Sequence, residues 1–155
     1  MSQNLSRMQQ IYKLFDGFSD ESRVWLYTAN RAITPTEAHF VQENLEEFAS
    51  NWKAHSTALK AKACLLHEYT IAFVVDQTTA NASGCSVDSS VRFVKELGKE
   101  LDINFFNRLN VVVEDENGNR TLHSYHKLKD LTQSSYYNPL VDSLYDLKNN
   151  WLKVI

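Results

Sequence analysis

The order in which strand and helix patterns follow one another constrains the fold of this chain most. Residues 23–28 are mainly β-branched or aromatic, with Trp25 and Tyr27 on one face, and predict a first strand. Residues 34–37, Thr-Pro-Thr-Glu, form a capping box that predicts the start of a helix. An apolar stripe follows at helical spacing, made of Val41, Leu45, Phe48 and Trp52. Such a stripe predicts a helix that packs on a sheet.

The middle of the chain predicts two antiparallel strands and a second helix. Residues 60–65 alternate between apolar and polar, residues 71–75 are a continuous apolar run, and His67-Glu68-Tyr69 predicts the turn between them. The second helix is expected to begin near Ser86, with apolar residues at helical spacing: Val87, Val91, Val94, Leu97 and Leu101.

The two ends of the chain add further elements. Residues 5–18 predict an N-terminal helix that ends at Gly17. Asn117-Gly118 predicts a hairpin with a tight primed turn, which needs positive φ at both central residues, between strands at 109–114 and 121–125. Asn138-Pro139 predicts the start of a last helix with an apolar stripe of Leu140, Leu144, Leu147 and Trp151.

The combined pattern predicts an α+β fold. The inner βαββαβ order is typical of a ferredoxin-like antiparallel sheet, here with an added N-terminal helix and a C-terminal hairpin strand and helices. A chain of 155 residues can bury a full core, so we expect one single domain over residues 1–155.

The charge and hydropathy of the sequence limit which partners the protein could bind and in which cellular compartment we expect it. The net charge is −3 with both signs interspersed, so no basic footprint favours nucleic acid. The longest apolar run, residues 71–75, is too short for a membrane span, and the first residues lack a signal-peptide pattern. We therefore expect a cytoplasmic protein in which Cys64 and Cys85 are free thiols.

The most unusual stretch is residues 83–90, Ser-Gly-Cys-Ser-Val-Asp-Ser-Ser, at the predicted start of the second helix. A helix N-terminus favours anions and lowers the pKa of a nearby thiol, so Cys85 is a candidate nucleophile. Alternatively, Ser86 only caps the helix, Asp88 complements its dipole in the first turn and Cys85 is inert. The candidate ligand-binding residues here are Ser83, Gly84, Cys85, Ser86, Asp88 and Ser89.

A second group of candidates could line a pocket beside the sheet: Trp25, Tyr27, Arg31, Trp52 and His55. Such aromatics are more often core, and His55 could instead donate to the carbonyls at the end of the first long helix. Cys64 and His67 should point to opposite faces of a strand, so zinc is not expected. No cofactor motif occurs, since Cys-x5-Arg, Gly-x-Ser-x-Gly and Walker patterns are all missing.

The strings at residues 23–31, 52–55 and 83–90, followed by 105–109 and on to Trp151, resemble a family of small uncharacterised bacterial proteins. Some members are labelled ABC transporter ATPases, a label that this chain does not support, because it lacks a Walker loop and a Leu-Ser-Gly-Gly-Gln string. The resemblance implies no reaction. It implies that one recurring pattern unites Trp25, Tyr27, Arg31, Trp52, His55 and residues 83–90.

Three hypotheses about function follow. The first is a binding module that holds a small anionic ligand or a protein partner at residues 83–90. The second is a cysteine-dependent enzyme or redox sensor that uses Cys85, assisted by His55 or Arg31. The third is a structural or interaction domain that forms a homodimer, or docks a partner chain, through an exposed aromatic surface, with Tyr136, Tyr137 and Trp151 as candidates. The sequence leaves open whether the protein is an enzyme.

Overall fold

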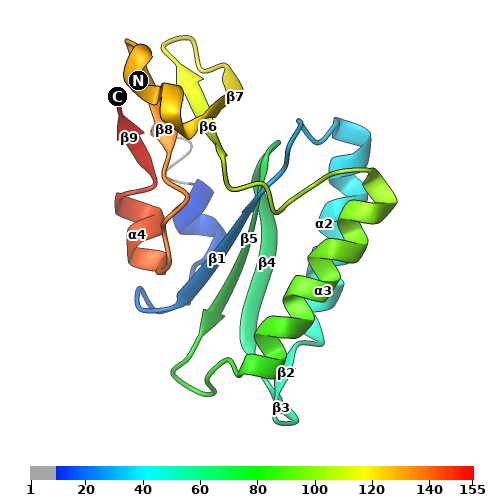
Figure 1. Cartoon of the computed structure of the whole chain (residues 1–155). Coiled ribbons are helices and arrows are strands. Elements are labelled where there is room, and N and C mark those ends of the chain that lie inside the picture. The colour runs from blue at the N-terminus through cyan, green and yellow to red at the C-terminus, as the bar shows by residue number, and fades with distance from the viewer. Residues whose placement is uncertain (1–9) are drawn as a thin grey trace.

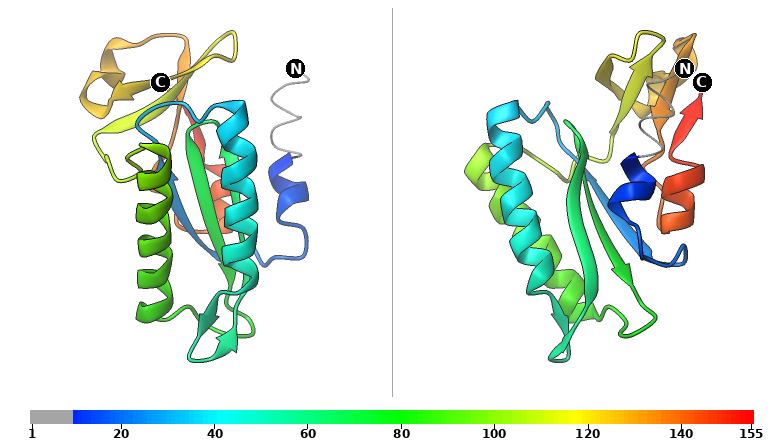
Figure 2. Two further views of the ribbon diagram at one scale, coloured as in Figure 1. Left: turned by 90° about the vertical axis from the view of Figure 1, so that its right-hand side faces the viewer. Right: turned by 180° about the vertical axis from the view of Figure 1, so that it is seen from behind.

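A computed structural model describes residues 10–155 (Figure 1). The first sheet is antiparallel, in the order β1-β5-β4, and consists of β1 (Arg23–Thr28), β5 (Thr70–Asp76) and β4 (Lys60–His67). Two long helices, α2 (Pro35–Ser50) and α3 (Gly84–Leu101), cover one of its faces (Figures 1 and 2). The short hairpin of β2 (Lys53–Ala54) and β3 (Thr57–Ala58) links α2 to β4. The central strand β5 is buried along its whole length, as its apolar run predicts.

The second sheet has the order β7-β6-β8-β9. Its strands and the short helices between them are β6 (Asn110–Asp115), β7 (Arg120–Ser124), η1 (Tyr125–Asp130), β8 (Ser134–Tyr137), α4 (Leu144–Asn149) and β9 (Leu152–Val154). Together with helical residues 10–14, α4 covers the face of the first sheet that α2 and α3 leave open (Figure 1). The predicted N-terminal helix is thus present from residue 10, and its first residues lie outside the described part of the chain.

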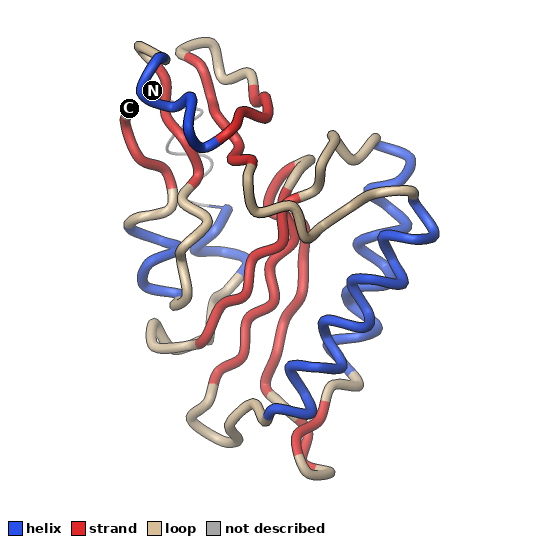
Figure 3. The backbone as a smooth tube through the Cα atoms, in the orientation of Figure 1, coloured by secondary structure: helices blue, strands red, loops and turns tan. Residues whose placement is uncertain are grey.

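The α+β class is confirmed, and β1, β4 and β5 pair as a βαββ order predicts. The fourth strand, β6, does not pair with β1. Both of its edges are occupied within the second sheet, by β7 on one side and β8 on the other. The loop between α3 and β6 crosses the end of β1 instead of running beside it (Figure 3). The first sheet therefore has three strands, where the sequence predicted four.

Several local predictions were wrong. The 117–118 turn is not a primed two-residue turn: Gly118 has φ +84° but Asn117 does not have positive φ, and the hairpin closes through Asp115 and Asn119. Asn138-Pro139 forms a turn, with the Leu140 N–H donating to Asn138 Oδ1, and α4 begins after Ser143. A side-chain cap at Ser143 explains this later start, because its hydroxyl accepts from the Asp146 N–H.

The prediction that Cys64 and His67 point to opposite faces was also wrong. A bulge between Leu65 and His67 breaks the alternation of β4. Cys64 is buried in the cluster that holds Trp151, and the His67 ring stacks on the Trp151 ring with centroids 5.4 Å apart. Burial raises the pKa of the Cys64 thiol to about 12, and both cysteines are free thiols.

Asp76 ties the end of β5 to the loop before β1. Its carboxylate accepts the Ser19 and Thr78 N–H groups at 3.0 Å each, and Lys60 Nζ lies 3.5 Å away. These donors, the Ser19 N–H first, lower the pKa of Asp76 from 3.8 to about 2 although the side chain is buried. The ionised form therefore stabilises the fold above pH 4.

We expect Asp76→Asn to lower the free energy of unfolding by about 2 kcal/mol at pH 7. Because the folded-state pKa is lowered, this contribution is lost as the pH falls from about 4 to about 2, where the variant should match the wild type. Urea unfolding at pH 7, 4 and 2 measures this. Asp130→Asn, an exposed change on η1, is the control. If the difference in the free energy of unfolding between Asp76→Asn and wild type stayed constant across this pH range, the charge of Asp76 would not be what stabilises the fold.

Candidate functional site

The predicted anion site at the start of α3 is largely satisfied by its own residues. Ser83, not Ser86, is the N-cap: its Oγ accepts the Ser86 N–H at 3.1 Å, and the Ser86 Oγ accepts the Ser83 N–H at 2.7 Å. Ser86 is buried, whereas Gly84 and Cys85 are exposed. A reciprocal capping box of this kind already pairs two of the N–H groups that an anion would use.

The remaining hydroxyls of this stretch also bond within the helix. Ser89 Oγ donates to the Ser86 carbonyl at 2.7 Å, and Ser90 Oγ donates to the Val87 carbonyl at 2.6 Å. Asp88 is exposed and lies beyond the first turn, so it does not complement the helix dipole there as predicted. The capping interpretation therefore accounts for most of the polar atoms in residues 83–90.

Trp25 and Tyr27 lie between the first sheet and the two long helices. Trp25 contacts Trp52 edge-on at 6.1 Å, and the Trp52 Nε1–H donates to the Ser86 carbonyl at 2.8 Å, which fixes the first turn of α3. The Tyr27 ring contacts Phe73 and Phe106. Burial raises the pKa of the Tyr27 phenol, although a hydrogen bond with Ser90 and the charge of Arg108 oppose this rise.

Arg31 and His55 lie apart from each other and serve local structure. Arg31 makes a bidentate ion pair with Glu37 at 2.9 Å and donates to the Leu101 carbonyl at 2.6 Å, and its hydrogen bonds to Glu37 lower the pKa of that carboxyl to about 2. Leu101 ends α3, about 24 Å along the helix from Cys85 at 1.5 Å per residue. Arg31 therefore cannot assist Cys85.

His55 is exposed in the β2–β3 turn with φ +51°, and the following Ser56 has φ +68°. It is a hairpin residue, so it does not cap α2 as predicted; Asn51 is the C-cap of that helix. Positive φ at both central residues is the primed geometry that the sequence predicted for Asn117-Gly118.

The aromatic residues predicted for a homodimer surface are mostly core. Tyr137 and Trp151 are buried and contact each other at 4.5 Å, and only Tyr136 is partly exposed. Tyr137 and Trp151 are buried because their rings contact His67 of the first sheet, and the three rings together join the first sheet to the second. The exposed aromatic surface on which the homodimer hypothesis was based is therefore not present at Tyr136, Tyr137 and Trp151.

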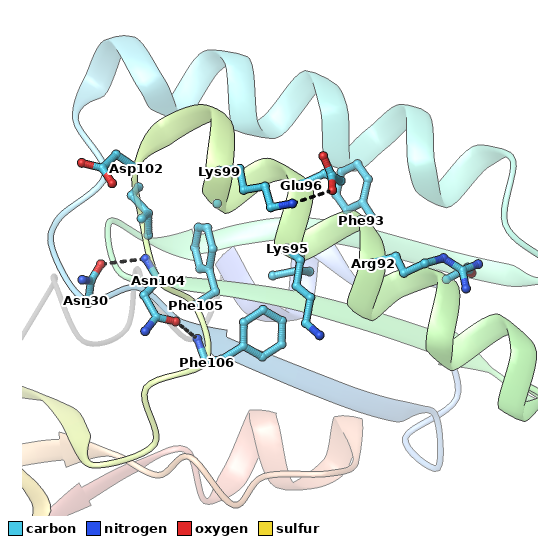
Figure 4. Close-up of a pocket in the computed structure, with 14 residues that line it drawn as sticks. Asn30, Arg92, Phe93, Lys95, Glu96, Lys99, Asp102, Asn104, Phe105 and Phe106 are labelled. Carbon is cyan, nitrogen blue, oxygen red and sulfur yellow. Dashed lines mark hydrogen bonds and ion pairs between the residues drawn. The ribbon is translucent and has the colours of Figure 1, made fainter.

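A groove runs along the exposed side of α3, between this helix and the loop that leads to β6 (Figure 4). This α3 groove has a volume of about 810 Å³. Phe93, Phe105 and Phe106 give it apolar walls, and Ser89 is the one predicted site residue that lines it. Gly98 allows the loop to return closely, because a Cβ there would lie 2.5 Å from the Ile103 carbonyl oxygen.

Cationic and donor groups surround these apolar walls. Lys95 Nζ lies 5.8 Å from the centroid of the Phe106 ring, and Lys99 pairs with Glu96 at 3.5 Å. Within residues 10–155, Arg92 and Lys95 have no carboxylate partner. Asn30 Oδ1 accepts the Asn104 N–H and Asn104 Oδ1 accepts the Phe106 N–H, so each amide presents its amino group as a donor.

No family model, curated protein or solved structure matches this chain. The resemblance to a family of small bacterial proteins therefore stays a prediction. Among the described residues, no group of three or more His, Cys, Asp or Glu side chains could hold a metal ion. None of the helices in residues 10–155 is long and apolar enough to cross a membrane.

The sequence did not predict the α3 groove, because basic residues on one side of a helix are typical of any solvent-exposed helix face. Arg92, Lys95 and Lys99 are spaced three and four residues apart, which places them on one side of the helix. One further signal was available, since an isolated glycine such as Gly98 inside a helical pattern often marks a close approach of another segment. The pairing of this face with Phe105 and Phe106 depends on the path of the loop.

Proposed function

We propose that this protein is a binding module that holds a small anionic ligand in the groove along α3. The observation that carries this proposal is the placement of Lys95 and Arg92, neither with a carboxylate partner in the described chain, beside the walls formed by Phe93, Phe105 and Phe106. A cation beside an aromatic wall favours a ligand with an anionic group on an apolar or aromatic body.

The size and polarity of the groove agree with such a ligand. Pockets for small molecules have volumes of about 300–1,000 Å³ and combine apolar walls with a few directed polar groups. At about 810 Å³ the α3 groove lies in this range. Its amide donors at Asn30 and Asn104 suit a carboxylate, sulfonate or phosphate oxygen.

We also propose that the first sheet with α2 and α3 is a ferredoxin-like unit whose fourth strand was redirected into the second sheet. The strand order β1-β5-β4 and the position of both helices on one face support this assignment. It has a direct consequence for the site, because the redirected loop supplies Phe105 and Phe106 to the groove.

Isothermal titration calorimetry with naphthalene-2-sulfonate tests the proposed function. We expect saturable binding, and we expect neutral naphthalene-2-sulfonamide to bind about tenfold more weakly because it lacks the charge. Lys95→Gln and Arg92→Gln should each weaken sulfonate binding roughly fivefold, which corresponds to about 1 kcal/mol.

Lys127→Gln is the matched control, since Lys127 is exposed on η1 and does not line the groove. It should leave the affinity unchanged. Equal affinity for the charged and neutral probes, or an equal loss in the Lys127→Gln control, would show that the α3 groove is not an anion site.

A further inference from the structure

The open edge of β1 is a second feature that could bind a partner, and it does not depend on the α3 groove. In the register with β5, Trp25 lies opposite Phe73 and Tyr27 opposite Ile71. The N–H groups of Val24 and Asn30 point away from β5, because they donate to the Asp142 and Asn104 carbonyls. Even-numbered residues of β1 therefore direct their backbone polar groups to the edge of the sheet.

Both ends of this edge are occupied by other segments of the chain. At the start of β1, residues 142–144 pair antiparallel with residues 22–24 through the Val24 and Leu144 N–H groups. Beyond the end of β1, the Asn30 N–H donates to the Asn104 carbonyl at 3.0 Å. Between these ends, the outward N–H groups of Leu26 and Thr28 have no backbone partner within residues 10–155.

A groove of about 380 Å³ lies over this unpaired stretch. Its floor is β1, from Val24 to Thr28. One wall comes from residues 105–108 and Asn110, and the other from residues 139–142. The edge is thus recessed between two walls, at the position that a fourth strand of the first sheet would occupy.

The two walls differ in chemistry. Phe106 and Arg108 line the first wall, and Arg108 makes no ion pair with any carboxylate in the described chain. Leu140 and Val141 line the second wall, and Leu140 is 80% exposed. A strand added to β1 would place alternate side chains against each wall. An acidic residue suits the Arg108 wall, and an aliphatic residue suits the Leu140 wall.

We propose that the open edge of β1 binds an extended segment of a partner protein by strand addition, with acidic and aliphatic residues alternating along that segment. Unpaired N–H groups at every second residue are the template that an added strand needs. A second copy of β1 does not fit, because each copy would bring its own two walls to the same edge. A single extended strand brings no such walls.

Hydrogen exchange of the free protein tests whether the edge is open. The Trp25 and Tyr27 amides, which face β5, should be protected, whereas the Leu26 and Thr28 amides should exchange at least about tenfold faster. Equal protection of all four amides at micromolar protein concentration would overturn the proposal, because the edge would then already be covered. Protection of Leu26 and Thr28 that rises with protein concentration would indicate self-association instead, and would also overturn it.

Binding of the peptide acetyl-Val-Glu-Val-Glu-Val-amide tests the proposed occupant. Along a paired strand, only every second residue directs its N–H toward the neighbouring strand. We therefore expect that N-methylation of the central valine and of the following glutamate will have opposite outcomes. One should weaken binding by about tenfold or more, and the other should have little effect. Equal effects of the two methyl groups, or no binding of the parent peptide, would overturn strand addition.

Two proline variants test the same claim from the protein side. Thr28→Pro removes an N–H that points outward, and proline is tolerated at such edge positions. It should weaken peptide binding about tenfold. Ala61→Pro removes an outward N–H from β4, the opposite edge, and should bind as the wild type does. If Thr28→Pro binds normally, or if Ala61→Pro loses binding equally while both remain folded by circular dichroism, the proposal is wrong.

Discussion

Replacing Phe73 by alanine is expected to lower the free energy of unfolding by about 4 kcal/mol, because the change empties the centre of the aromatic core. Phe73 lies at the middle of β5 and is fully buried. Its ring contacts four aromatic neighbours at centroid distances of 5.7–6.3 Å: Tyr27, Phe48, Trp52 and Phe93. Alanine removes the buried ring and leaves a cavity that β1, α2 and α3 cannot fill without moving.

Urea unfolding of wild type and Phe73→Ala measures this loss. Phe40→Ala is the control, because Phe40 is 38% exposed on α2 and its loss should cost less than about 1 kcal/mol. If Phe73→Ala costs less than about 2 kcal/mol, the aromatic cluster does not hold the helices on the sheet. Since Phe93 also lines the α3 groove, the same variant is expected to weaken naphthalene-2-sulfonate binding.

Replacing Arg120 by methionine is expected to cost about 3 kcal/mol, because Arg120 joins the two sheets through charge. It forms a bidentate pair with Glu68 at 2.7 and 2.8 Å and donates to Glu114 Oε1 at 3.2 Å. Glu114 is buried, and the Tyr137 hydroxyl donates to the same oxygen at 2.6 Å. Burial is the largest single effect on the Glu68 carboxyl and raises its pKa, but the hydrogen bonds and charge of Arg120, together with a backbone hydrogen bond and the charge of His67, outweigh burial and lower the pKa.

The loss should arise from buried negative charge that no longer faces a cation, so Glu114→Gln in the Arg120→Met background should recover at least about 1 kcal/mol. Lys99→Met is the control: its pair with Glu96 is 3.5 Å long and exposed, so the change should stay within about 0.5 kcal/mol. Thermal unfolding of these three variants compares the stability that the buried network contributes with the stability that an exposed ion pair contributes. An Arg120→Met variant as stable as the wild type would show that the network does not hold the sheets together.

Much of the fold follows from local sequence. The capping box at Thr34 and Glu37 starts α2, the 23–28 pattern is β1, and the apolar run at 71–75 is the buried central strand. These elements could be predicted because cap chemistry and periodicity act within a few residues. The destination of β6 could not, because it depends on competition between β1, β7 and β8 as partners.

The candidate site was harder to predict for the same reason. Residues 83–90 attracted the interpretation of an anion site because helix N-termini have unpaired N–H groups, but Ser83 and Ser86 pair two of them with each other. The α3 groove forms only where the loop after α3 brings Phe105 and Phe106 beside Lys95. Such a juxtaposition of residues from different elements leaves no pattern in the sequence.

One measurement tests the proposed function most directly: the amide chemical shifts of the protein titrated with naphthalene-2-sulfonate. The α3 groove predicts saturable shifts confined to its lining, which is Asn30, Ser89, residues 92–96, residues 98–99 and residues 102–106, with Ser83 to Ser86 unchanged. Shifts centred on Gly84 and Cys85 would return the anion site to the start of α3, and scattered shifts without saturation would mean that the protein has no anion site on this helix.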